Sequence, residues 1–204
     1  MAQRLREKLR ASLKQWIEEP GAKALNAVGL TPNSITILGF LISAVGAALV
    51  GMGLLWQGGL VFLAGGALDL FDGALARMTG RVTTFGALLD SLFDRLGESA
   101  LYLGLAVYGA TDDPESRQLG VYMTLLILAF TSSQGVSYLR ARGEALGLDM
   151  KGGLMTRPER VVILSAGLVI GEAEVLLALG LIAFFSTWTM LTRLLHIWRG
   201  IKTG

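Results

Sequence analysis

The chain has 204 residues, of which 52% are hydrophobic and only 17% are charged. A soluble domain of this size usually carries about 25% charged residues, so the composition excludes an ordinary soluble domain and predicts an all-α integral membrane protein. The net charge of +2 gives no indication of a nucleic-acid partner, and the absence of cysteine excludes disulfides and thiolate metal sites.

The N-terminal segment is charged and is expected to form a unit of its own. Five apolar residues share one face of a helix drawn over residues 3–19: Leu5, Leu9, Leu13, Trp16 and Ile17. We expect this amphipathic helix to lie on the cytoplasmic membrane surface; a solvated helix that caps the bundle is the alternative. Residues 1–30 would then form a juxtamembrane region, and residues 31–204 the transmembrane domain.

Six membrane-spanning helices are expected in the rest of the chain. The run from Ala24 to Leu68 carries no charge, and one span needs about 20 residues, so this run should hold two spans. The polar break Gln57-Gly58-Gly59 is the expected turn between them. The six spans are predicted in chain order at about residues 34–55, 59–78, 84–110, 118–139, 158–170 and 175–198.

The placement of charge predicts how this bundle is oriented. Basic residues gather in the N-terminal segment, in the turn from Arg77 to Arg81, in the loop over residues 140–160 and in the tail. The connections on the other side are uncharged or rich in acids. Because basic loops stay in the cytoplasm, both termini are expected inside, with the protein in the cytoplasmic membrane.

One charged stretch interrupts the apolar sequence: LDLFDGALARMTGRVTTFGALLDSLFDRLGE, residues 68–98. Asp69 and Asp72 are spaced i, i+3, and Asp90 and Asp94 are spaced i, i+4, so each pair occupies one face of a helix. Both pairs flank the same basic turn. The two helices are therefore expected to run antiparallel with their carboxylates facing each other near the cytoplasmic end.

Four aspartates in this position need a partner. A charged side chain in mid-membrane costs about 2.5–3.5 kcal/mol, and carboxylates held close together repel one another. A divalent cation relieves both costs, and oxygen ligands without Cys or His favour Mg²⁺, Mn²⁺ or Ca²⁺. The alternative is a salt-bridge network that joins the helices through Arg77, Arg81 and Arg95. Glu98, one turn beyond Asp94, is expected to pair structurally, for example with Arg95.

The pattern D-x2-D-G-x2-A-R-x8-G-x3-D-x3-D over residues 69–94 resembles the signature of the CDP-alcohol phosphotransferases. Members of that family move a phosphatidyl or similar group from a CDP-linked donor to an alcohol and release CMP. The resemblance extends to the six spans, the cytoplasmic termini and the chain length. It implies a phospholipid-biosynthetic enzyme that needs Mg²⁺ or Mn²⁺, with two ions, and that is typically a homodimer.

The resemblance also implies a role for individual residues. The implied metal ligands are Asp69, Asp72, Asp90 and Asp94, and Asp94 is a ligand, the general base, or both. The implied lining of the CDP-donor pocket is Asp72, Gly73, Ala76, Arg77, Thr83, Gly86 and Asn33. Asn33 belongs to the stretch TPNSIT, residues 31–36, which resembles the family's opening of the first span but is also an ordinary helix start.

Two later stretches resemble family members that make phosphatidylinositol phosphate. These are SYLRARGEALGL, residues 137–148, and TRPER, residues 156–160; archaeal synthases of the ether-lipid equivalent are similar. In that group basic residues bind the phosphate of the acceptor, and the matching positions here are Arg140, Arg157 and Arg193. The implied acceptor is inositol 1-phosphate. Glycerol 3-phosphate, serine and an archaeal-type ether-lipid donor remain as alternatives.

Simpler interpretations of the arginines stay open. The positive-inside rule alone accounts for Arg140 and Arg157, and Arg142 and Arg160 would then pair with Glu144 and Glu159. Arg193 differs, because it lies inside an apolar segment, where a charge needs a reason. For the aspartates, the two competing hypotheses are a cation transporter and a purely structural bundle joined by salt bridges.

Overall fold

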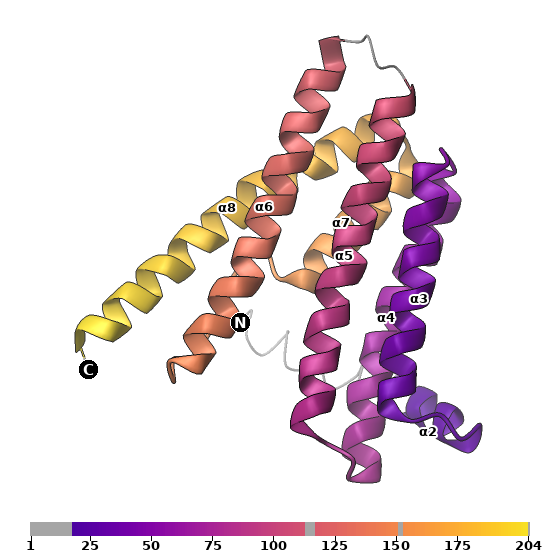
Figure 1. Cartoon of the computed structure of the whole chain (residues 1–204), viewed down its shortest axis with the longest axis vertical. Coiled ribbons are helices and arrows are strands. Elements are labelled where there is room, and N and C mark those ends of the chain that lie inside the picture. Colours follow the sequence, from indigo (N-terminus) through magenta and orange to yellow (C-terminus); the bar gives the residue numbers. More distant parts are fainter. Residues whose placement is uncertain (1–17, 113–116, 151–152, 204) are drawn as a thin grey trace, which may run out of the picture.

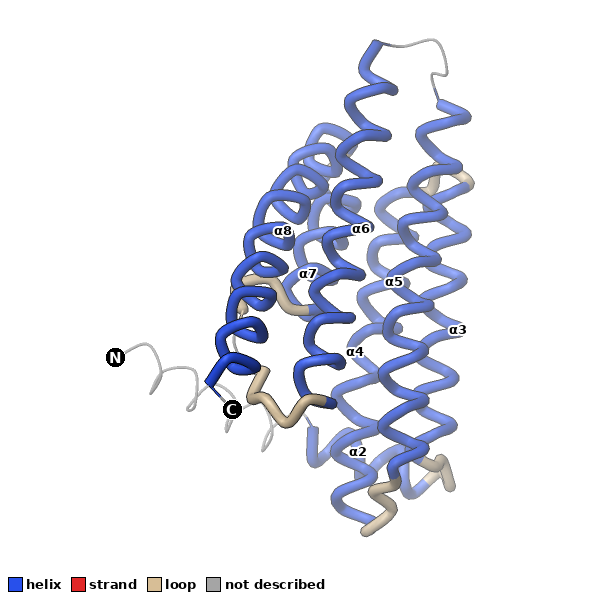
Figure 2. Tube along the Cα trace, turned by 60° about the vertical axis from the view of Figure 1, so that its left-hand side comes forward, coloured by secondary structure: helices blue, strands red, loops and turns tan. Residues whose placement is uncertain are grey.

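The structure is a computed structural model that describes residues 18–112, 117–150 and 153–203, all of whose regular elements are α-helices (Figures 1 and 2). These elements are α2 (Glu19–Ala27), α3 (Pro32–Gly51), α4 (Leu55–Thr79), α5 (Thr84–Asp112), α6 (Arg117–Ala145), α7 (Arg157–Ile170) and α8 (Glu172–Thr203). The described residues contain no strand. The amphipathic helix expected over residues 3–19 lies outside the described residues, apart from its last two positions.

Each of the six expected spans corresponds to one helix, from α3 to α8. Four of these helices are long and apolar enough to cross a membrane: α3, α4, α6 and α8. Helix α5 is as long as these but is interrupted by the charges of the predicted site, and α7 has only 14 residues. The all-helical architecture is therefore confirmed for the described residues, and four of the helices qualify as membrane spans by length and composition.

The turn between the first two of these helices lies at residues 52–54, and the prediction of a turn at Gln57-Gly58-Gly59 is wrong. Gly53 adopts a φ of +82°, a conformation that glycine reaches without steric cost. Gly58 and Gly59 lie within α4, where each allows another helix to come close. A Cβ on Gly59 would lie 2.7 Å from the Cβ of Leu168 on α7.

The helices form two packed groups, which are joined by α7 and by contacts between α5 and α6. Helices α3, α4 and α5 pack together, α6 packs on α8, and α7 contacts both α4 and α8 (Figure 1). Small residues allow α3 and α4 to approach closely, since a Cβ on Gly46 would lie only 2.6 Å from the backbone nitrogen of Phe62. This close packing brings α3 side chains against the aspartate face of α4.

Two apolar clusters leave a polar zone between them. The larger one joins the six helices from α3 to α8 and includes Phe62 on α4 and Leu101 on α5. The smaller one joins α2, α3 and α4 and includes Leu75. Along α4, Asp69 and Asp72 fall between Phe62 and Leu75, so the carboxylates lie where neither apolar cluster fills the space.

Helix α7 begins part-way along the bundle rather than at its end (Figure 1). Its start is defined by a capping box, in which the backbone nitrogen of Thr156 donates to Oε2 of Glu159 at 3.0 Å. Pro158 stands in the first turn, where its missing N–H costs nothing. Because α7 starts deep in the bundle, its first residue, Arg157, reaches the level of the α4 carboxylates.

Candidate active site

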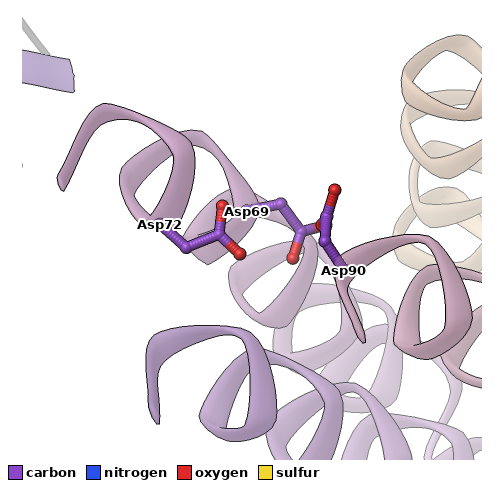
Figure 3. A group of neighbouring side chains, drawn as sticks. All are labelled: Asp69, Asp72 and Asp90. Atoms are coloured by element: carbon purple, nitrogen blue, oxygen red, sulfur yellow. The ribbon is translucent and has the colours of Figure 1, made fainter. Parts of the chain in front are cut away.

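Three carboxylates from two helices converge in the polar zone. Asp69 and Asp72 on α4 and Asp90 on α5 each offer an oxygen, and these oxygens lie within 4.8 Å of one another. Figure 3 shows the Asp69 and Asp72 carboxylates directed toward Asp90. A set of carboxylate oxygens suits a hard divalent cation such as Mg²⁺ or Mn²⁺. The residues therefore fit the predicted metal site, and the expected facing of the two aspartate pairs is borne out for these three residues.

Thr36 on α3 completes this cluster and was not singled out from the sequence. Its hydroxyl donates a hydrogen bond of 2.6 Å to Oδ2 of Asp72, and both side chains are buried. Such a bond orients a metal-binding carboxylate and leaves its other oxygen for the metal. Thr36 stands in the quoted stretch TPNSIT one turn after Asn33, so the spacing on the helix was the available signal.

Replacing Thr36 by valine is expected to weaken binding of Mn²⁺ about tenfold or more, as is usual when a supporting hydrogen bond to a ligand is removed. Valine keeps the shape of the side chain, so the helix packing should persist. Calorimetric titration of the purified protein with Mn²⁺ measures the effect. Thr124→Val is the matched control, because among the described residues that hydroxyl donates to Gly120 O of its own helix, away from the carboxylates. Equal affinity in Thr36→Val and the wild type would contradict the supporting role.

Arg157 links the fourth aspartate to the cluster. Its Nη1 lies 2.5 Å from Oδ1 of Asp94 and also forms an ion pair with Asp69. The expected salt-bridge partners do not take this position, since Arg77 pairs with Glu18 at 3.3 Å on the surface. The proposed network through Arg77, Arg81 and Arg95 is thus not the arrangement found, and the cation between the carboxylates comes from α7.

A cleft on one side of the carboxylates is lined by all the residues predicted for the donor pocket. The predicted residues in its lining are Asn33, Asp72, Gly73, Ala76, Arg77, Thr83 and Gly86. Gly86 allows the walls to close together here, because a Cβ at that position would lie 3.0 Å from Oγ1 of Thr83 and 3.2 Å from Oδ1 of Asn33. The structure therefore brings all seven of these residues to one cleft, together with neighbours such as Thr36 and Arg81.

A second cleft opens on the other side and is polar. It brings together the three predicted arginines, which lie on three different helices: Arg140 on α6, Arg157 on α7 and Arg193 on α8. Arg193 is buried and donates to Val136 O at 2.7 Å, whereas Arg140 is exposed and pairs with Glu144 at 2.9 Å. Asp90 lines both clefts, so the two spaces meet at the carboxylates.

The other expected ion pairs are replaced by different ones. Glu98 pairs with Arg160 rather than with Arg95, whose Nη2 donates to Ser137 O at 3.2 Å. Glu159 serves the capping box of α7 and therefore does not pair with Arg160. The ion pairs predicted between residues close in sequence are therefore wrong, because the charged faces of α5 and α7 contact each other.

Comparison with known proteins agrees with this geometry. The sequence model of the family described as CDP-alcohol phosphatidyltransferase matches residues 29–198. The chain belongs to the CDP-alcohol phosphatidyltransferase family. It is therefore a membrane-associated transferase of phospholipid biosynthesis, and the resemblance noted in its sequence is confirmed.

Similar members of the family have related names. A phosphatidylinositol phosphate synthase of Mycolicibacterium smegmatis is 42% identical over 154 residues, which cover 74% of this chain and 67% of that protein. An archaetidylinositol phosphate synthase of Methanothermobacter thermautotrophicus is 32% identical over 182 residues, covering 86% and 87% of the two chains.

Solved structures of the family show the same fold. The phosphatidylinositol phosphate synthase of Mycobacterium tuberculosis with CDP-DAG bound superposes with a TM-score of 0.80 at 35% identity, covering 89% of this chain and 94% of that one. The same enzyme in complex with manganese and citrate gives a TM-score of 0.80 at 35% identity, covering 89% of each chain. That relative therefore binds a divalent metal on the same fold.

Proposed function

We propose that this chain transfers the phosphatidyl group of CDP-diacylglycerol to inositol 1-phosphate and releases CMP. The observation that carries the proposal is the meeting of two clefts at Asp90, one lined by the residues implied for the CDP donor and one lined by arginines. The relatives named as phosphatidylinositol phosphate synthases support the same donor and product class. An anionic donor and a phosphorylated acceptor would then approach the carboxylates from opposite sides.

The donor side of the proposal rests on the cleft between α3, α4 and α5. We assign Asn33, Gly73 and Ala76 to the walls around the cytidine, where small side chains leave room. Arg77 and Thr83 supply a cation and a hydroxyl for the diphosphate oxygens. The relative with CDP-DAG bound supports a donor of this class.

The metal side rests on the three converging carboxylates and on Asp94. We propose that Asp69, Asp72, Asp90 and Asp94 hold two Mg²⁺ or Mn²⁺ ions, the manganese complex of the relative being in line with this. When bound, such ions neutralise the diphosphate and stabilise the oxygens that attack and leave. Side chains of the protein bind the two substrates and transfer the proton.

The transfer itself is a displacement at phosphorus. The acceptor hydroxyl forms a new bond to the phosphorus of the phosphatidyl group, and the bond from that phosphorus to the CMP oxygen breaks. Asp94 takes the proton of the hydroxyl, since it lines the arginine cleft one helical turn from Asp90, where the two clefts meet. CMP leaves with the bonding electron pair on its phosphate.

The acceptor phosphate is held by Arg140, Arg157 and Arg193. Arginine suits a phosphate because its planar fork can donate two parallel hydrogen bonds. Arg157 has donor capacity to spare: its buried Nε–H has no hydrogen-bond partner among the described residues. A phosphate oxygen in the cleft would satisfy this group, which otherwise carries an unrelieved desolvation cost.

The proposal includes the membrane arrangement expected from the charges. Residues 31–204 form the catalytic domain with six spans, residues 1–30 form the juxtamembrane region, and both termini face the cytoplasm from the cytoplasmic membrane. The four long apolar helices and the large exposed apolar residues, such as Leu41 and Phe184, are in keeping with this. The chain would act as a homodimer, as is typical of its family.

An acceptor panel tests the proposed function. Purified protein is supplied with CDP-diacylglycerol and Mg²⁺ or Mn²⁺, and release of CMP is compared for inositol 1-phosphate, glycerol 3-phosphate, serine and free inositol. We expect turnover with inositol 1-phosphate and at least about 100-fold less with free inositol, because the lost phosphate contacts each contribute about 1.5–3 kcal/mol. Preferred use of another acceptor would refute the assignment, and metal flux in proteoliposomes without CDP-lipid would favour a transporter.

A further inference from the structure

A buried ion pair in the lining of the arginine cleft has no part in the proposed chemistry. Glu98 on α5 accepts two hydrogen bonds from Arg160 on α7, from Nε at 2.6 Å and from Nη2 at 2.7 Å. The two residues are only 4% and 1% exposed. Arg160 is thus the largest of the fully buried side chains among the described residues, and its charge is matched by one carboxylate through a bidentate contact.

Two ion pairs join α5 and α7, an upper rung formed by Asp94 and Arg157 and a lower rung, deeper in the bundle, formed by Glu98 and Arg160. Glu98 follows Asp94 by four residues on α5, and Arg160 follows Arg157 by three residues on α7, so each lies one turn below its counterpart. The upper rung, between Asp94 and Arg157, has side chains that are 24% and 21% exposed, whereas those of the lower rung are 5% and 2% exposed. A ligand in the cleft can therefore reach the side chains of Asp94 and Arg157, whereas those of Glu98 and Arg160 are almost inaccessible to solvent.

The lower rung also joins the start of α7 to the surrounding elements. Nη1 of Arg160 approaches Met155 O, in the connection before α7, and Nη2 approaches the hydroxyl of Ser137 on α6, both at 3.4 Å. Helix α7 packs chiefly against α4 and α8, so its link to α5 at this depth is made by side chains. One guanidinium therefore ties α5, α6 and the beginning of α7 together, three residues from Arg157.

We propose that Glu98 and Arg160 are positioning residues that set where Arg157 meets the acceptor phosphate. A buried ion pair adds little net stability compared with apolar residues of similar volume, because both ions lose their hydration. Its distinctive contribution is geometric, because the planar guanidinium donates two parallel hydrogen bonds to the carboxylate and so fixes the relative orientation of the two groups. The inference rests on the proposed function of the arginine cleft. It adds that the ion pair fixes the position of Arg157 relative to the rest of the cleft.

The decisive variant is Arg160→Lys, which keeps the charge and loses the fork. We expect the KM for inositol 1-phosphate to rise about tenfold, because a displacement of about 1 Å at a reacting centre is costly, while the KM for CDP-diacylglycerol stays within about twofold. Binding of inorganic phosphate, measured by calorimetry, should weaken to a similar degree. This second measurement does not depend on which alcohol is the acceptor.

Two further variants separate positioning from stability. The double variant Glu98→Leu/Arg160→Met replaces the pair by apolar residues, and we expect a melting temperature close to that of the wild type together with a raised acceptor KM. Tyr102→Phe, one turn below Glu98 on α5, removes a buried hydroxyl that lies 3.3 Å from Ser133 Oγ and should leave both KM values unchanged.

The outcomes distinguish this inference from the proposed function. Absence of wild-type turnover with inositol 1-phosphate would overturn the acceptor assignment, and phosphate binding by the variants would still decide the positioning role. Wild-type phosphate affinity and acceptor KM in Arg160→Lys, or in a folded double variant, would overturn the positioning role alone. An equal rise in the KM values for donor and acceptor would also overturn it, since that result indicates general loosening of the bundle.

Discussion

Replacing Asp94 by asparagine is expected to lower kcat by about 10³-fold while leaving CDP binding nearly intact. Asparagine has the same shape and can still contact Arg157, but its amide cannot accept the proton of the acceptor hydroxyl, and loss of a general base usually costs 10²–10⁴-fold. Asp94 lies outside the group of three carboxylates within 4.8 Å and lines the arginine cleft. Nucleotide contacts on the other side should therefore survive.

The measurement is CMP release at saturating CDP-diacylglycerol and metal, accompanied by calorimetric titration with CDP and with Mn²⁺. Glu172→Gln is the matched control, because it neutralises a carboxylate that bonds to Tyr108 at 2.6 Å outside both clefts. Full activity of Asp94→Asn would contradict the role of general base. Loss of Mn²⁺ binding in step with activity would reassign Asp94 to metal binding alone.

Replacing Arg157 by methionine is expected to move two measured quantities in opposite directions. The acceptor KM should rise about 100-fold, which corresponds to about 2.8 kcal/mol, because a buried phosphate loses charge-assisted hydrogen bonds. The affinity for Mn²⁺ should increase, because the guanidinium that pairs with Asp69 and Asp94 no longer competes with a cation for their oxygens. Acceptor kinetics and Mn²⁺ calorimetry measure the two effects.

Arg142→Met is the control for the change in charge. Arg142 lies near the end of α6, two residues after Arg140, but it lines neither cleft and is exposed. Its replacement should leave the acceptor KM and the Mn²⁺ affinity unchanged. A fall in Mn²⁺ affinity in Arg157→Met would show that this arginine organises the carboxylates rather than competing with a metal. An unchanged acceptor KM would remove it from the phosphate site.

The features that the sequence predicted correctly depend on spacing within one helix. Asp69 and Asp72 share a face because residues three apart on a helix always do, and this holds however α4 packs. The residues that the family resemblance implied for the donor pocket all line one cleft, most of whose lining comes from α4, α5 and the short connection between them. The apolar runs likewise predicted the helices, with an error only where glycines at positions 58 and 59 served packing instead of a turn.

The contacts between distant segments were decided by the tertiary structure. Arg157 meets Asp69 across 88 positions, and Arg160 meets Glu98 across 62, whereas the sequence suggested partners within a few residues. The support of Asp72 by Thr36 depends in the same way on how closely α3 packs against α4.

The sequence by itself determined the family, the helical membrane architecture and the carboxylates, because each of these follows from local spacing or composition. The tertiary structure alone decided which cation faces which carboxylate. That choice depends on the depth at which α7 begins and on its register against α5. These are set by packing between helices, and periodicity within one helix carries no information about them.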